Sequence, residues 1–227
     1  MSGLAYYPIH LDVSGKTCLV AGGGAVAARK VQTLLECGAS VLVVSPWLCP
    51  ALESLAGQNA ILVRRRGYKK SDLKNVFLVI GATDDEAANA QISADARERN
   101  MLVNIVDRPA ECSFIVPSVL RRKDLVITVS TGGKSPAFAK HLRKELEGRF
   151  GPEYGDFLEL MGAIRARLLA QAHAPEEHKG LFERLIAGGL LEHIQNKDLE
   201  KADALLYAVL GTGFTVRDLM PEWICGP

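Results

Sequence analysis

The stretch Cys18-Leu-Val-Ala-Gly22-Gly23-Gly24-Ala-Val-Ala27-Ala-Arg-Lys30 decides the fold of this chain. The apolar run from Thr17 to Ala21 predicts a buried parallel strand, and the helix-forming residues after the glycines predict a helix. Gly22 permits a sharp turn, Gly24 lets the backbone approach a pyrophosphate, and Ala27 allows close packing of helix on strand. Free amides at the start of such a helix face phosphates, so the pattern indicates a dinucleotide-binding turn.

The residues that follow complete a βαβ unit of about 30 residues, which favours this interpretation over a tight glycine turn in any α/β protein. Gly38 is a C-cap for the helix, and Ser40 to Val44 is a second apolar strand. Where many such folds carry an acidic residue to bind the ribose, this chain has Ser45-Pro46-Trp47-Leu48. Ser45 can hydrogen-bond a ribose, but it cannot select NAD over NADP by charge.

Further strands are predicted at 60–63, 76–82 and 102–106, with a helix at 86–100. This alternation predicts a Rossmann-like, doubly wound parallel sheet, in which ligands bind outside the carboxyl ends of the strands. Asp84 and Asp85 also fit as caps of the helix that begins near Glu86. The predicted cofactor-binding residues at these strand ends are Gly22, Gly23, Gly24, Ala25, Val26, Ser45, Pro46, Trp47, Leu48, Ala82, Thr83 and Asp84.

The pattern changes after residue 112. Two apolar strands, 114–120 and 124–130, are joined by the basic turn Arg121-Arg122-Lys123, and Ser135 is a candidate N-cap for a helix at 137–149. Helical spacing continues from Tyr154 to the end of the chain. We therefore expect a dinucleotide-binding domain at 1–112, a small α+β segment for dimerisation and substrate binding at 113–150, and a helical domain at 151–227.

Asp107 is the candidate catalytic residue. It follows a buried strand on the rim that carries the glycine turn, where a carboxylate can accept a proton while a hydride moves to nicotinamide. Its alternative role is a cap or a salt bridge with Arg108. Asn104 could orient either a ligand or the loop.

A second glycine turn, Thr131-Gly132-Gly133-Lys134-Ser135, lacks the spacing of a nucleotide-phosphate loop. Its amides and Lys134 are better suited to a substrate carboxylate, because a glycine turn before a helix favours an anion. His141 lies on the helix that follows, among Lys140, Arg143 and Lys144.

The overall composition is that of an ordinary soluble protein: 227 residues, 48% hydrophobic, with a formal charge of +1. We expect a cytoplasmic protein with no membrane segment, and the near-neutral charge argues against nucleic-acid binding. The five cysteines and five histidines show no metal-ligand spacing, so no metal site is predicted. Two short basic clusters, Arg64–Arg66 with Lys69-Lys70 and Arg121–Lys123, are interpreted as solvated turns.

Five motifs of this chain, in their order and spacing, closely resemble those of precorrin-2 dehydrogenase, the dehydrogenase/ferrochelatase module of siroheme synthase. They are the first glycine turn, Ala82-Thr-Asp-Asp85, Asn104-Ile-Val-Asp107, Ser113-Phe-Ile-Val-Pro117 and Val129-Ser-Thr-Gly-Gly-Lys-Ser-Pro136. The resemblance spans residue 8 to about residue 150. It implies an NAD-dependent oxidation of precorrin-2 to sirohydrochlorin, in which Asp107 matches the catalytic aspartate of the family. It also implies a homodimer in which the middle segment exchanges strands.

Precorrin-2 carries eight carboxylates, so the resemblance gives the basic residues of the middle segment a reason to surround a cofactor site. The chain departs from the family at Thr131, where relatives often have serine. It also lacks the methyltransferase module of the fused enzymes, so we expect another protein to supply precorrin-2. The predicted substrate-binding residues are Asn104, Arg121, Thr131, Gly132, Gly133, Lys134, Ser135 and His141.

Two alternatives stay open at this point. A bifunctional enzyme would also insert ferrous iron into sirohydrochlorin, as some relatives do. A non-catalytic, NAD-responsive binding module is the more remote alternative, because a fold does not fix a function.

Overall fold

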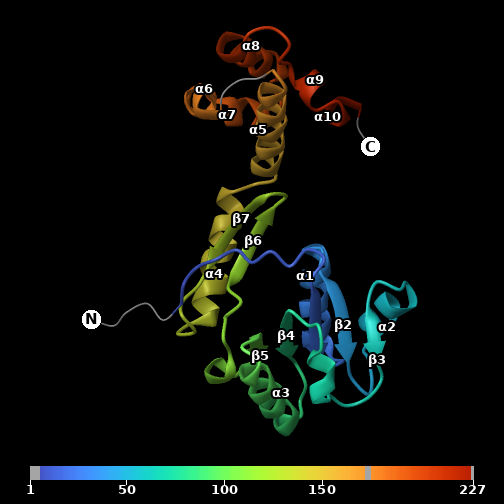
Figure 1. Cartoon of the computed structure of the whole chain (residues 1–227). Helices are drawn as coiled ribbons and strands as arrows, with labels where there is room; N and C mark the ends of the chain where they lie inside the picture. Colours follow the sequence, from blue (N-terminus) through green and yellow to red (C-terminus); the bar gives the residue numbers. More distant parts are fainter. Residues whose placement is uncertain (1–5, 172–174, 226–227) are drawn as a thin grey trace. The chain divides into compact units, whose positions relative to one another are not determined.

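A computed structural model describes residues 6–171 and 175–225 of the chain, which divides into two compact units, Met1–Val116 and Pro117–Pro227 (Figure 1). Each unit is described by itself. Within the described residues, no helix is both long enough and apolar enough to cross a membrane.

The first unit is built on a five-stranded parallel sheet with the order β3-β2-β1-β4-β5 (Figure 1). Strands β2 and β3 lie on one side of β1, and β4 and β5 lie on the other. This confirms the predicted doubly wound sheet, and it puts the point where the strand order reverses beside β1. The strands are β1 Thr17–Ala21, β2 Ser40–Val44, β3 Leu62–Arg64, β4 Leu78–Gly81 and β5 Leu102–Ile105.

Helices cover both faces of this sheet because alternate strand residues point to opposite faces. Cys18 and Val20 of β1 belong to a core with the buried residues of α1 and α2, whereas Leu19 and Ala21 belong to a core with those of α3. The helices are α1 Ala25–Glu36, α2 Pro50–Gly57 and α3 Glu86–Glu98, with short 3-10 turns at η1 Lys70–Leu73 and η2 Pro109–Glu111.

Two local features differ from the sequence-based expectation. Helix α2, which has a proline in its first turn and a fully buried Leu52, was not predicted. The strand predicted at 114–120 begins only at Ser118. The chain before it instead runs beside β5, where the Ser113 amide donates to the Val103 carbonyl at 2.8 Å and the Asn104 side chain donates to the Phe114 carbonyl at 3.0 Å.

The second unit begins with the antiparallel hairpin β6 Ser118–Arg122 and β7 Leu125–Val129, on which helix α4 Pro136–Arg149 packs. Ser135 caps α4 by accepting from the Phe138 amide at 3.2 Å, as predicted. The helices that follow bury a separate apolar core around Leu160, Ile164 and Leu206. They are α5 Glu153–Ala170, α6 Pro175–Ala187, α7 Leu190–Gln195, α8 Leu199–Leu210, α9 Val216–Leu219 and α10 Glu222–Cys225.

Candidate functional site

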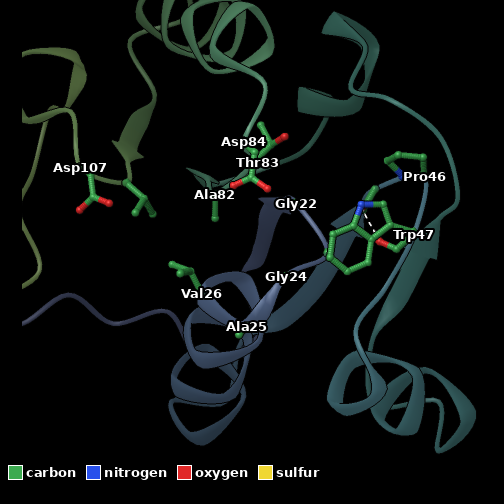
Figure 2. A pocket seen from close by; sticks show the side chains of 13 residues that line it. Gly22, Gly24, Ala25, Val26, Pro46, Trp47, Ala82, Thr83, Asp84 and Asp107 are labelled. Atoms are coloured by element: carbon green, nitrogen blue, oxygen red, sulfur yellow. Dashed lines mark hydrogen bonds between the residues drawn. The ribbon is translucent and has the colours of Figure 1, made fainter.

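A cavity of about 380 Å³ opens at the carboxyl ends of the parallel strands in the first unit (Figure 2). Four segments meet there: the turns that follow β1, β2, β4 and β5. Eleven of the twelve predicted cofactor-binding residues line this cavity, together with Asp107, and Val106 was not predicted. The lining is Gly22, Gly23, Gly24, Ala25, Val26, Ser45, Pro46, Trp47, Ala82, Thr83, Asp84, Val106 and Asp107.

The turn after β1 leaves no room for side chains at two of its three glycines. Gly22 has a φ of +132°, and a Cβ there would lie 2.2 Å from the Ala82 carbonyl oxygen. A Cβ on Gly23 would lie 1.8 Å from the Trp47 carbonyl oxygen. Glycine is therefore required at both positions, because it alone tolerates the backbone angle of the first and the close contact of the second.

The start of α1 fits the pyrophosphate of a dinucleotide. Its N-cap, Gly24, offers no side chain to the free amides, and the first turn contains no acidic residue. The first helical hydrogen bond runs from the Ala28 amide to the Gly24 carbonyl at 3.0 Å, so the amides of the first turn, Ala25 to Ala27, have no acceptor within the helix. These amides and the positive end of the helix dipole favour an anion at this position.

The turn after β2 is fixed by its own hydrogen bonds. Ser45 is only 3% exposed, and its hydroxyl donates to the Trp47 carbonyl at 2.6 Å. The Cys49 amide donates to the Gly23 carbonyl at 2.7 Å, which holds this turn against the turn after β1. Leu48, the remaining predicted cofactor residue, packs into the core and lies outside the cavity lining.

The two aspartates of the turn after β4 have different roles, one as a helix cap and one in the cavity lining. Asp85 caps α3 by accepting from the Ala88 amide at 3.1 Å, whereas Asp84 lines the cavity. The Asn89 side chain donates to the Thr83 carbonyl at 2.8 Å, which ties the cavity rim to α3.

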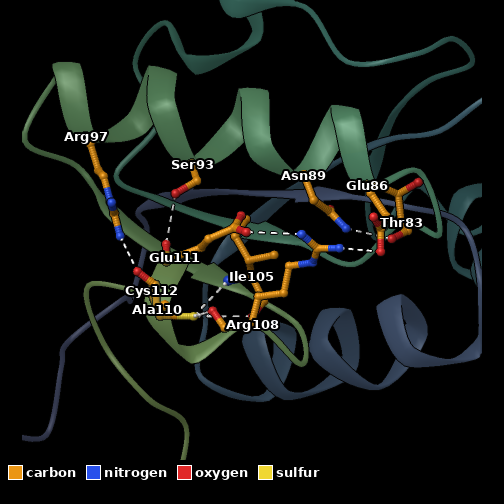
Figure 3. A network of polar contacts seen from close by, with 10 residues as sticks. All are labelled: Thr83, Glu86, Asn89, Ser93, Arg97, Ile105, Arg108, Ala110, Glu111 and Cys112. Atoms are coloured by element: carbon orange, nitrogen blue, oxygen red, sulfur yellow. Dashed lines mark hydrogen bonds and ion pairs between the residues drawn. The ribbon is translucent and has the colours of Figure 1, made fainter.

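Asp107 is exposed at the rim of the cavity and has a φ of +60°. A non-glycine residue in this left-handed region is uncommon, and such residues cluster at functional sites. The alternative of a salt bridge with Arg108 is not what the structure shows. The Arg108 guanidinium instead pairs with Glu86 at the start of α3 and with Glu111, at 3.2 Å for the latter (Figure 3).

The loop that presents Asp107 is closed by Cys112. Its sulfur accepts from the Ile105 amide at 3.1 Å, and its single S–H is shared between the carbonyl oxygens of Ile105 and Arg108, which lie 3.3 and 3.2 Å from the sulfur (Figure 3). The thiol thus satisfies backbone groups at the end of β5, next to the point where Ser113 pairs with Val103. Asn104 is buried, and its amide donates to the Phe114 carbonyl, so in this structure it orients the loop. Its predicted contact with substrate stays a prediction.

Lys30 of α1 is electrostatically coupled to Asp107 and was not predicted as a site residue. Burial lowers the pKa of its ammonium group and Arg29 lowers it further, while the negative charge of Asp107 raises it. The signal in the sequence was the basic pair Arg29-Lys30 shortly after the glycine turn.

The other predicted substrate-binding residues belong to the second unit. Thr131 accepts from the Ser135 amide at 3.1 Å, and Gly132 and Gly133 have φ values of +60° and +81°, so the segment forms a tight turn before α4. His141 lies 3.4 Å from Glu145, and the Arg121 side chain donates to the Lys123 carbonyl at 3.2 Å. The roles of these residues toward a substrate stay predictions.

Several basic side chains of the two clusters form ion pairs or hydrogen bonds within their own unit. Arg64 and Arg66 both pair with the buried Asp72, which differs from the solvated turn that was expected. In the second unit, Arg122 donates to the Phe150 carbonyl at 2.9 Å, and Lys123 pairs with Asp156 at 2.7 Å. Among the described residues, which do not include His173, no group of three or more His, Cys, Asp or Glu side chains is placed to hold a metal.

Comparisons with known proteins agree with this geometry. Residues 9–118 match the family described as "Putative NAD(P)-binding", and residues 122–149 match the family described as "Sirohaem biosynthesis protein central". The siroheme synthase of Thioalkalivibrio sulfidiphilus is 38% identical over 213 residues, which are 94% of this chain and 44% of that protein. The siroheme synthase of Nitrosospira multiformis is 40% identical over 193 residues, which are 83% of this chain and 41% of that protein.

A solved structure, "SirC, precorrin-2 dehydrogenase", shares the fold with a TM-score of 0.76 at 24% identity, covering 90% of this chain and 98% of that one. The match over residues 9–118 and the parallel sheet put the first unit in a class described as putative NAD(P)-binding, which agrees with the predicted dinucleotide site. The chain is a homologue of the siroheme synthases over most of its length, and it spans about 44% of the length of the relative from Thioalkalivibrio sulfidiphilus.

Proposed function

We propose that this chain oxidises precorrin-2 to sirohydrochlorin in siroheme biosynthesis, with NAD as the hydride acceptor. The observation that carries the proposal is that Asp107 lines the same cavity as the glycine turn. The homology to siroheme synthases and the fold shared with a precorrin-2 dehydrogenase support it.

The oxidation removes a hydride and a proton from the macrocycle. NAD, when bound, would supply the hydride acceptor. Asp107 accepts the proton or stabilises the positive charge that develops when the hydride leaves. The turns after β1 and β2 hold the dinucleotide. Contacts of Asn104 in the first unit, and of Arg121, His141 and the turn Thr131–Ser135 in the second, with substrate carboxylates stay predictions.

The decisive experiment replaces Asp107 with asparagine. Asparagine tolerates a positive φ, so Asp107→Asn keeps the loop conformation that alanine would strain. We expect the affinity for NAD to change less than about twofold and turnover to fall by roughly 100-fold or more, because general-base catalysis has about this size. Turnover is followed as NADH absorbance together with the sirohydrochlorin spectrum.

An exposed carboxylate in the second unit provides the control, and Asp124→Asn keeps wild-type turnover. Full turnover by Asp107→Asn would refute the assigned role. Wild-type protein that binds NAD but does not oxidise precorrin-2 would favour the non-catalytic, NAD-responsive alternative. Iron insertion into the product stays a prediction, as does a cytoplasmic location.

We also propose that the active form is a homodimer. The hairpin β6–β7 forms a sheet of only two strands in the described part of the chain, so each strand has an outer edge that is not paired within this sheet. Unpaired edges are templates for pairing with a second copy. Sedimentation equilibrium of the full chain, whose mass is 24.5 kDa, distinguishes dimer from monomer, and a monomer at assay concentration would refute the proposal.

A further inference from the structure

The cavity wall formed by the turn after β2 contains no carboxylate. In sheets of this type, the adenosine half of a dinucleotide lies against this turn, where an acidic residue binds the ribose hydroxyls. Here the turn offers Ser45, Pro46 and Trp47, and the Ser45 hydroxyl already donates to the Trp47 carbonyl. The two carboxylates of the lining, Asp84 and Asp107, follow β4 and β5, on the other side of β1.

Trp47 supplies a large planar surface in place of that acid. The residue is 55% exposed, although tryptophan is among the residues that are buried most on average. The indole lies beside the glycine turn, and its Cη2 atom would be 3.9 Å from a Cβ on Gly24 (Figure 2). The Ser45 hydroxyl and the Cys49 amide fix the backbone around it. A held, exposed aromatic ring of this kind is a platform on which a nucleobase stacks.

The neighbouring strand end is basic. The Ser45 amide donates to the Arg64 carbonyl at 3.1 Å, so the end of β3 adjoins the turn that carries Trp47. Arg64 and Arg66 share the single carboxylate of Asp72, which leaves one positive charge in excess, and their side chains are 44% and 35% exposed. Arg65 is balanced by Glu53 at 2.7 Å. This edge therefore does not repel a phosphate on the adenosine ribose.

We propose that the chain holds the adenine of its dinucleotide by stacking on Trp47 and binds NADP about as tightly as NAD. The inference rests on the proposed function only in assigning the cavity to a dinucleotide. The protein recognises the adenine ring and the pyrophosphate, which NAD and NADP share. It lacks the acidic side chain that, in other proteins with this sheet, binds the ribose hydroxyls and repels a 2′-phosphate.

The test is direct binding of NAD and NADP to the full chain, without tetrapyrrole. The sequence contains two tryptophans, so in a Trp223→Phe background the fluorescence reports Trp47 alone. We expect both cofactors to quench this fluorescence, with dissociation constants within about threefold of each other. The Trp47 variants lack this fluorophore, so their affinities are measured by isothermal titration calorimetry beside the wild type. Trp47→Ala weakens the binding of both cofactors by roughly tenfold or more, as is typical when a stacking ring is lost, and Trp47→Phe restores most of the affinity.

Two further variants sharpen the result. Leu62→Ala is the matched control, because Leu62 is 71% exposed in the neighbouring strand and does not line the cavity, so it leaves both affinities unchanged. Pro46→Asp introduces a carboxylate on the exposed turn and weakens NADP at least tenfold more than NAD. Binding that is unchanged in Trp47→Ala, or a wild-type preference for NAD above about 100-fold, overturns the inference. Either outcome with normal oxidation of precorrin-2 leaves the proposed function intact.

Discussion

Gly23 lies where the turns after β1 and β2 touch, and they can touch because Gly23 has no side chain. Its carbonyl accepts from the Cys49 amide, and the space of a Cβ is already taken by the Trp47 carbonyl at 1.8 Å and the Ser45 hydroxyl at 2.6 Å. Neither atom can move freely, since the Ser45 hydroxyl is hydrogen-bonded to the Trp47 carbonyl. The absence of a side chain at Gly23 thus lets the turns after β1 and β2 approach each other this closely.

We therefore expect Gly23→Ala to separate the two turns. The added methyl group lowers the free energy of unfolding by about 1–3 kcal/mol, the usual cost of overpacking, and it weakens dinucleotide binding at least tenfold. Urea unfolding and calorimetric titration measure the two effects. Gly67→Ala is the control, because a Cβ there meets nothing within 4 Å. Wild-type affinity in Gly23→Ala would show that the contact is not required.

At the scale of elements, the loop after β5 is held from both sides. On one side, the Cys112 sulfur bonds to the backbone of Ile105 and Arg108. On the other side, three contacts tie the loop to α3: Arg108 pairs with Glu86, the Ser93 hydroxyl donates to the Glu111 carbonyl at 3.0 Å, and Arg97 donates to the Ala110 carbonyl at 2.6 Å (Figure 3). Because the turn before α3 also carries Thr83 and Asp84, this helix connects two walls of the cavity.

Arg108→Met removes the pair with Glu86 while keeping an unbranched side chain of similar length. We expect turnover to fall about tenfold because Asp107 loses its fixed position, whereas the affinity for NAD stays within about twofold. The separation of kcat from the dissociation constant distinguishes this positioning role from general destabilisation. Arg99→Met, at the C-cap of the same helix, is the control. A parallel loss of NAD affinity in Arg108→Met would contradict the positioning role.

Sequence patterns predicted most of these elements but not their contacts. The strands and the Ser135 cap follow from apolar runs and from a hydroxyl before Pro136, which are local signals. Helix α2 was not predicted because it is short and only Leu52 of its eight residues is buried. In the first part of the strand expected at 114–120, strand structure gives way to pairing with β5, a contact between segments about ten residues apart that no local pattern encodes.

At the scale of the whole molecule, each unit has an apolar core of its own, and the first also buries a charged group. The Asp72 side chain is fully buried. Burial alone would raise the pKa of its carboxyl group, but hydrogen bonds from Arg66, the Lys69 amide and Arg64 outweigh this effect and lower the pKa to about 2.

The stability of the protein therefore depends on pH through Asp72. The folded pKa lies below the ordinary value of 3.8, so the contribution is fully present above about pH 4 and is lost as the pH falls toward 2. It amounts to about 2 kcal/mol of unfolding free energy. Urea unfolding of the wild type between pH 5 and pH 2 measures the loss. Asp72→Asn is less stable at pH 5 but shows a shallower pH dependence; an unchanged slope would contradict the assignment.

The sequence by itself determined the parallel sheet, the glycine turn and the candidate Asp107, because strand periodicity, missing side chains and position after a strand are properties of short segments. Only the tertiary structure decided that Asp84 lines the cavity while Asp85 caps α3, that Arg108 pairs with Glu86 rather than Asp107, and that the Trp47 ring lies exposed beside the glycine turn. Those outcomes depend on which side chains from distant segments compete for the same partner. That competition is settled only when the strands are brought side by side.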